Sequence, residues 1–101
     1  MADEYGPFDT EREARATRAA AVIRAAFDAA PGYGASIPAR LKVMTDACEA
    51  SGVALGAWDL GFLQGVAWRE VADCVSLAGM IRRAYEAGKA AREPATEASD
   101  D

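Results

Sequence analysis

The chain has 101 residues, of which 25 are alanine, and its formal net charge is −5 at neutral pH. This length suits one domain, and no apolar run approaches the roughly 18 residues that a membrane span needs. The acidic N-terminus has no apolar stretch of the kind found in secretory signals, so we expect a cytoplasmic protein with no membrane partner. The absence of histidine excludes histidine-based triads, histidine metal sites and the usual general base near neutral pH.

The high alanine content and the few β-branched residues favour helices, because alanine loses no side-chain entropy in a helix. The sequence therefore predicts an all-α fold, a compact four-helix bundle-like domain over residues 10–92. Residues 1–9 are predicted to form a flexible acidic tail, from which Tyr5 and Phe8 can dock onto the body. Residues 93–101 are predicted to form a disordered acidic tail, because they offer nothing to bury.

The first helix is predicted to run from Thr10 to about Ala30, where Pro31 and Gly32 stop it. Thr10 and Glu13 have the spacing of a capping box, in which each side chain accepts a hydrogen bond from the backbone of the other residue.

The second helix is predicted to begin near Ser36 and to end at Ser51, with Gly52 in the left-handed conformation that commonly follows a helix. Its apolar positions recur at helical spacings of four, three and four residues, and they are Ile37, Leu41, Met44 and Cys48. This stripe predicts that one face of the helix is buried.

The third helix is predicted to open at residues 55–59 and to end before a break at residues 68–70. It contains Gly61 and Gly65, and glycine inside a helix costs about 1 kcal/mol relative to alanine. We interpret the two glycines as positions where the backbone of a neighbouring helix approaches closely. The alternative interpretation is a shallow groove or the seam of a homodimer.

Two tryptophans stand ten residues apart on either side of this glycine-bearing segment. Large aromatic side chains contribute strongly to cores and to binding interfaces. We expect at least one tryptophan in the core and the other at a partly exposed contact. The candidate residues for a protein interface are Trp58, Gly61, Phe62, Gly65 and Trp68.

The last helix is predicted to run from about Val71 to Lys89, and Pro94 closes it. Its apolar stripe is Cys74, Leu77, Ala78, Ile81 and Tyr85. Both cysteines fall on apolar helix faces, so we expect buried free thiols. A disulfide between helices and a reactive thiol are the alternatives.

Basic residues cluster on the first and last helices, and such clusters offer a route to nucleic acid. The simpler interpretation is a solvated face, and the neighbouring acidic ends of the chain would compete with phosphate. Nucleic acid is therefore the less favoured partner. The candidate residues for this role are Arg12, Arg15, Arg18, Arg82, Arg83 and Lys89.

Three segments carry a resemblance, namely LGAWD at residues 55–59, WRE at residues 68–70 and ADCVSLAGMIRRAYEAG at residues 72–88. Over roughly residues 40–90 the chain resembles small uncharacterised proteins of actinobacteria and of their phages or integrative elements. Such relatives are expected to carry proline near position 71, where this chain has Val71. The resemblance implies a cytoplasmic, phage-encoded accessory protein, and it brings no catalytic residue or ligand.

No carboxylate pair, phosphate-binding glycine loop or nucleophile–base pair stands out, and two cysteines are too few for a zinc site. We therefore expect no enzymatic activity, no cofactor and no bound metal. The favoured function is binding to a protein partner, as an accessory or regulatory protein that is encoded by a phage or mobile element and acts on a host protein. The alternatives are a DNA-associated transcriptional regulator and a self-assembling virion or assembly component.

Overall fold

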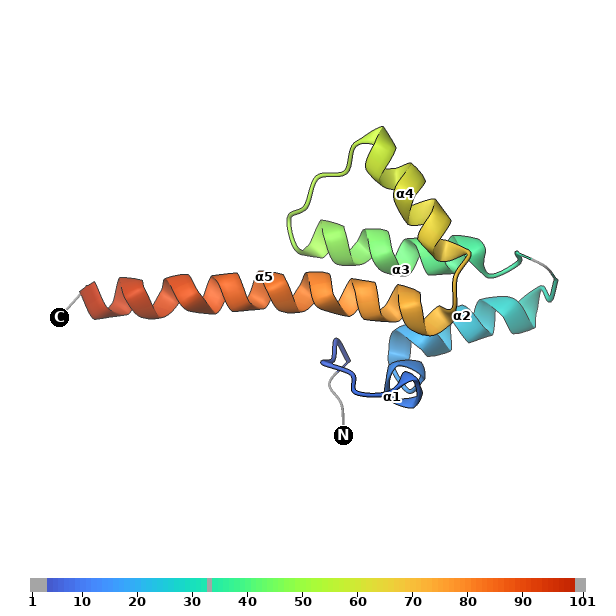
Figure 1. Ribbon diagram of the computed structural model, residues 1–101, viewed down its shortest axis with the longest axis horizontal. Coiled ribbons are helices and arrows are strands. Elements are labelled where there is room, and N and C mark those ends of the chain that lie inside the picture. Colours follow the sequence, from blue (N-terminus) through green and yellow to red (C-terminus); the bar gives the residue numbers. More distant parts are fainter. Residues whose placement is uncertain (1–3, 33, 100–101) are drawn as a thin grey trace.

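The structure is a computed structural model that describes residues 4–32 and 34–99, and within them the chain is helical with no strand. Its helices are α1 (Glu11–Arg15), α2 (Arg18–Ala29), α3 (Ile37–Ala50), α4 (Ala57–Ala67) and α5 (Val71–Ser99). The predicted all-α, bundle-like fold is confirmed, with five helices in the described part of the chain rather than four. Helices α3 and α5 lie side by side and run in the same direction, while α4 returns obliquely from α3 to the start of α5 (Figure 1).

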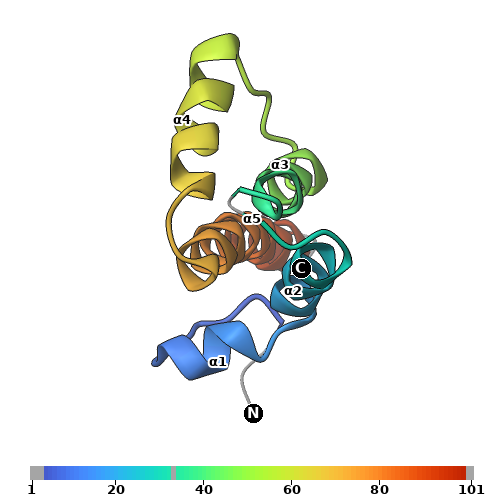
Figure 2. The same ribbon diagram turned by 90° about the vertical axis from the view of Figure 1, so that its right-hand side faces the viewer.

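Helix α5 supplies buried side chains to both halves of the core. One cluster joins α1, α2 and α5, and it consists of Ala14, Ala20, Ile23, Ala72 and Val75. The other cluster joins α3, α4 and α5, and it consists of Met44, Cys48, Leu63, Ala67 and Cys74. Figure 2 shows the resulting arrangement, in which α1 and α2 lie on one side of α5 and α3 and α4 lie on the other.

Two predicted helix ends are confirmed in detail. The Glu13 amide donates to the Thr10 hydroxyl (3.2 Å), and the Glu13 carboxylate accepts from the Thr10 amide (3.3 Å). At the end of α3, Gly52 has φ of 75°, and the Val53 amide donates to the Cys48 carbonyl (2.8 Å). These bonds pair backbone groups that the ends of a helix otherwise leave without partners.

The helix is interrupted between Arg15 and Arg18, in contrast to the single helix expected over residues 10–30. The buried Thr17 hydroxyl donates to the Ala14 carbonyl (2.8 Å) and accepts from the Ala20 amide (3.1 Å). A threonine that bonds the backbone in this way competes with helical hydrogen bonds and caps a new helix. The break lets α1 turn and pack against α5 (Figure 2).

Residues 4–9 are docked on the helices, in contrast to the flexible tail predicted for residues 1–9, of which residues 1–3 lie outside the described part of the chain. The carboxylate of Glu4 accepts hydrogen bonds from the backbone amides of Arg18 and Ala19, each at 2.9 Å. These amides open α2, where the helix dipole favours a negative charge.

The docked segment is also fastened to α5. The Tyr5 carbonyl accepts a hydrogen bond from Arg83 Nε at 2.8 Å, and Phe8 packs against the first core cluster. Gly79 makes this approach feasible, because a Cβ atom there would lie 2.5 Å from the Tyr5 carbonyl oxygen. The expectation that Tyr5 and Phe8 dock onto the body is therefore confirmed.

Helix α5 continues to Ser99, in contrast to the helix end predicted near Lys89 and the disordered tail predicted for residues 93–101. Pro94 removes one helical hydrogen bond, but the residues around it are largely alanine, glutamate and arginine, which are strong helix formers. Residues 100–101 lie outside the described part of the chain. The far half of α5 projects beyond the other helices and accounts for the 59 Å length of the molecule (Figure 1).

The two glycines of α5 provide a matched test of the docked segment. Gly88→Ala introduces a Cβ atom that meets nothing within 4 Å, so we expect the free energy of unfolding to rise by about 0.5–1 kcal/mol. Gly79→Ala makes the same backbone change but displaces Tyr5, so we expect it to lower stability and to speed amide exchange at residues 4–8. Urea denaturation and hydrogen exchange measure both effects, and equal stabilisation by the two changes would contradict the docking.

Candidate functional site

Helix α4 has an inner side that packs into the core. Leu63 and Ala67 are buried there, in the cluster that also contains Met44 and both cysteines. Partly buried aliphatic side chains of α3 and α5, among them Leu41 and Leu77, pack against the same cluster.

The opposite side of α4 presents its largest side chains to solvent. Trp58 is 88% exposed and Phe62 is 61% exposed. Gly61 and Gly65 lie on the same side of the helix as these two rings, because the spacings from residue 58 to 61, 62 and 65 are three, one and three residues. We call this side the α4 outer face, and it consists of Trp58, Gly61, Phe62 and Gly65.

The expectation that at least one tryptophan lies in the core is wrong. Trp68, just after α4, is 53% exposed, and Trp58 is still more so. The ring of Trp68 lies against Gly34, where a Cβ atom would come within 2.9 Å of the indole. Gly34 also has φ of 80°, so its backbone and its position beside the ring both favour glycine. The interface candidates therefore all lie at the surface, with Trp68 resting on the loop before α3.

The interpretation of Gly61 and Gly65 as close helix contacts is wrong as well. A Cβ atom built at either position meets nothing within 4 Å. The alternative interpretation, a shallow groove or a homodimer seam, stays a prediction. Because glycine has no side chain, the helix backbone is exposed beside the rings of Trp58 and Phe62.

The start of α4 is capped locally, and its end is hydrogen-bonded to α3. At its start, the Gly56 amide donates to the Asp59 carboxylate at 2.9 Å. At its end, the Arg40 guanidinium donates to the carbonyls of Ala67 (3.2 Å) and Arg69 (2.6 Å). A cation is favoured at the C-terminal carbonyls of a helix, so Arg40 of α3 holds α4 in place.

Sequence reasoning missed the role of Arg40, because its two acceptors lie 27 and 29 residues further along the chain. Among the described residues, the only local hydrogen bond of the Arg40 side chain is with Ser36, four residues earlier, whose hydroxyl accepts from Arg40 Nε at 3.0 Å. A spacing of four residues indicates only that the two side chains are neighbours on one helix, and it does not predict a contact with α4.

Three of the six basic residues predicted as nucleic-acid candidates take part in contacts within the chain. Arg15 forms ion pairs with two carboxylates, at 2.7 and 3.2 Å. Arg82 stacks over an aromatic ring at 5.0 Å, and Arg83 donates to a backbone carbonyl. The other three are exposed, and they are Arg12, Arg18 and Lys89.

The expectation of buried free thiols at Cys48 and Cys74 is confirmed. Burial raises the pKa of both thiols, so both stay protonated at neutral pH. Among the described residues, no three or more His, Cys, Asp or Glu side chains are placed to hold a metal ion. In the same ranges, no helix combines the length and the apolar character that crossing a membrane requires.

Replacement of the α4 glycines tests whether the outer face is open. We expect Gly61→Ala and Gly65→Ala each to raise the free energy of unfolding by about 0.5–1 kcal/mol, because alanine stabilises a helix that nothing crowds. Chemical denaturation at two protein concentrations measures this. A loss of stability that depends on protein concentration would instead place a second copy of the chain against these glycines.

The buried thiols predict slow alkylation. Only the thiolate reacts readily, and both thiols are protonated and enclosed, so we expect iodoacetamide to react at least about tenfold more slowly with the native protein than with the urea-unfolded protein. Mass spectrometry of samples quenched over time measures the rates. Rapid labelling of either cysteine in the native state would contradict its burial.

Comparison of the chain with protein-family models, with curated proteins and with solved structures finds no match. The geometry and chemistry of its own side chains are therefore what indicate a function, and they single out the exposed aromatic face of α4.

Proposed function

We propose that the chain is a non-enzymatic accessory or regulatory protein that binds a partner protein through the α4 outer face. The observation that carries this proposal is the exposure of Trp58 and Phe62 on a helix that packs into the core on its other side and is held at its C-terminal end by Arg40. Burying a large apolar side chain stabilises a complex by about 1.5–3 kcal/mol. Aromatic residues held in position lose little entropy on binding and often dominate interface energetics.

The shape and charge of the outer face favour an apolar helix as the bound element. At Gly61 and Gly65 no side chain covers the backbone, so another helix can approach it closely. The two aromatic rings lie beside these glycines. Asp59 is the only charged residue of α4, and its carboxylate already accepts a hydrogen bond from the start of the helix. The face therefore offers no charge for an ionic partner, and a partner helix with small, uncharged side chains complements it best.

The resemblance to proteins of actinobacterial phages and integrative elements favours a host protein as the target. A second copy of this chain is the alternative occupant of the face, which would make the protein a homodimer or an assembly component. A DNA-associated regulator is less favoured, because three of the six candidate basic side chains, those of Arg15, Arg82 and Arg83, are engaged in contacts within the chain.

The double variant Trp58→Ala/Phe62→Ala tests the proposal. We expect protein capture from a nuclease-treated actinobacterial lysate to fall by at least about tenfold, because each truncation removes apolar contact area from the interface. The fold should be unchanged, since both side chains point away from the core. Quantitative mass spectrometry of the captured proteins gives the ratio, and circular dichroism checks the fold.

Val22→Ala is the matched control, because Val22 is an exposed apolar residue on α2 and should leave capture unchanged. Equal capture by the double variant and the wild type would contradict the role of the outer face. Partners that are captured from an untreated lysate but not from the nuclease-treated lysate would favour the DNA-associated alternative. A solution mass of two or more chains that falls in the double variant would favour self-assembly.

A further inference from the structure

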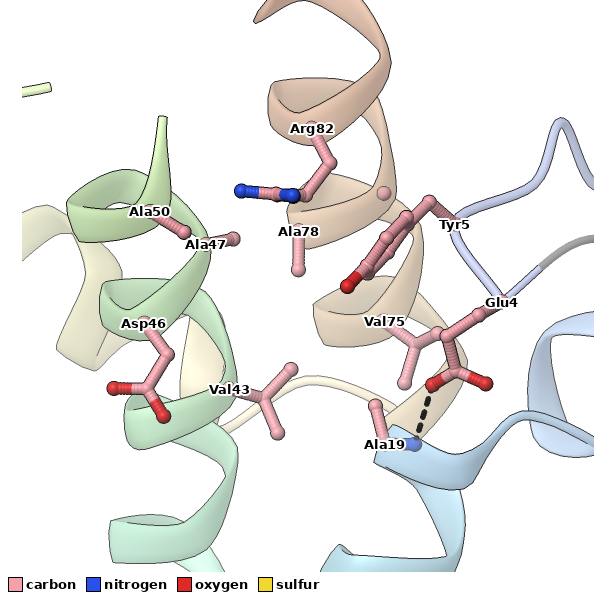
Figure 3. A pocket seen from close by; sticks show the side chains of 11 residues that line it. Glu4, Tyr5, Ala19, Val43, Asp46, Ala47, Ala50, Val75, Ala78 and Arg82 are labelled. Carbon is pink, nitrogen blue, oxygen red and sulfur yellow. Dashed lines mark hydrogen bonds between the residues drawn. The ribbon is translucent and has the colours of Figure 1, made fainter. Parts of the chain in front are cut away.

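A cavity of about 300 Å³ lies between the docked N-terminal segment, α3 and α5 (Figure 3). Its walls are largely apolar and come from both helices, and they include Val43, Ala47, Val75 and Ala78. The ring of Tyr5 forms a further side, and its hydroxyl points into the space (Figure 3). Ligand sites typically combine such an apolar enclosure with a few polar groups that orient the ligand.

Three charged residues line the cavity, and the carboxylates of two of them already accept hydrogen bonds. The Glu4 carboxylate accepts two backbone hydrogen bonds from the start of α2, each at 2.9 Å (Figure 3). The Asp46 carboxylate accepts from Lys42 Nζ at 2.9 Å. Both carboxylates thus have donors within the protein, and neither needs a ligand as a partner.

Arg82 is the third charged residue, and its guanidinium is poorly paired. Its Nε atom is buried and has no hydrogen-bond partner. Its contact with the Glu86 carboxylate is long, at 3.9 Å, and the Tyr5 ring lies 5.0 Å from the guanidinium carbon. Figure 3 shows the guanidinium between that ring and the end of α3, at the edge of the cavity.

A guanidinium with so few hydrogen-bond partners is unfavourable, and such groups commonly mark a place where a water molecule or a ligand completes the bonding. The two terminal nitrogens of a guanidinium can together donate to the two oxygens of a carboxylate. Because Arg82 is the only cation among the described residues that line the cavity, the site suits a ligand with a single negative charge better than a phosphate dianion.

We propose that this cavity binds a small organic carboxylate with an apolar body. The carboxylate accepts hydrogen bonds from Arg82, and the apolar body packs against Val43, Ala47 and Val75. The hydroxyl of Tyr5 is a second donor for the same ligand. This site is separate from the α4 outer face, so it stands whether or not that face binds a protein.

The test uses phenylacetate as the probe and phenylacetamide as its uncharged counterpart, each titrated at millimolar concentrations into the ¹⁵N-labelled protein. We expect phenylacetate to shift the amide signals of Ala47, Ala78 and Gly79, with an affinity at least about tenfold higher than that of phenylacetamide. Equal affinity of the two compounds, signals that do not shift, or shifts confined to other parts of the protein would overturn the proposal.

Two variants separate the charge from the cavity. Arg82→Met keeps much of the apolar stem and should weaken phenylacetate binding by at least about tenfold, while binding of phenylacetamide stays the same. Ala50→Leu fills the cavity from its exposed edge and should weaken both compounds. Ala84→Leu, at an exposed position of α5 that does not line the cavity, is the matched control and should change neither.

The ¹⁵N spectrum of each variant also reports whether the N-terminal segment stays docked. If Arg82→Met releases that segment, the Ala50→Leu variant decides the question, because it leaves the guanidinium and its contacts in place. Undiminished phenylacetate binding by a folded Ala50→Leu variant would show that the ligand binds elsewhere and would overturn the proposal.

Discussion

The first three turns of α5 are the part of the molecule on which every other element depends. Over residues 71–81 this helix is approached by α1 and α2 on one side, by α3 and α4 on the other, and by the N-terminal segment. The buried residues here are no larger than valine, and they are Ala72, Cys74, Val75, Ala78 and Gly79. Small side chains allow close packing on several sides of one helix, so a chain with few large apolar residues still encloses a core.

Local signals in the sequence were sufficient to predict most of the helices. The capping box at Thr10, the glycine end of α3 and the apolar stripe through Met44 depend on residues a few positions apart, and the structure bears them out. Two boundaries were not predicted, because each depends on a balance of terms. Thr17 forms backbone bonds that interrupt the helix, and α5 continues through Pro94 although proline removes one helical hydrogen bond.

The arrangement of α4 depends on contacts between distant parts of the chain, and here the sequence was less informative. Periodicity placed Trp58 and Phe62 on an apolar face but did not indicate whether that face is covered. The deciding facts are the packing of Leu63 against α3 and α5 and the hold of Arg40 on the end of the helix. Neither fact can be inferred from neighbouring residues in the sequence, which is why the glycine spacing predicts close helix contacts where nothing approaches Gly61 or Gly65.

Because α4 is a single short helix with a buried side and an exposed side, neighbouring positions on it are subject to different evolutionary constraints. Substitutions at Leu63 or Ala67 alter a core shared with α3 and α5, and any replacement must conserve volume. Substitutions at Trp58 or Phe62 leave that core untouched, so these positions are free to follow changes in a binding partner. A scaffold of this kind can acquire a new specificity through residues three or four positions apart while its fold stays the same.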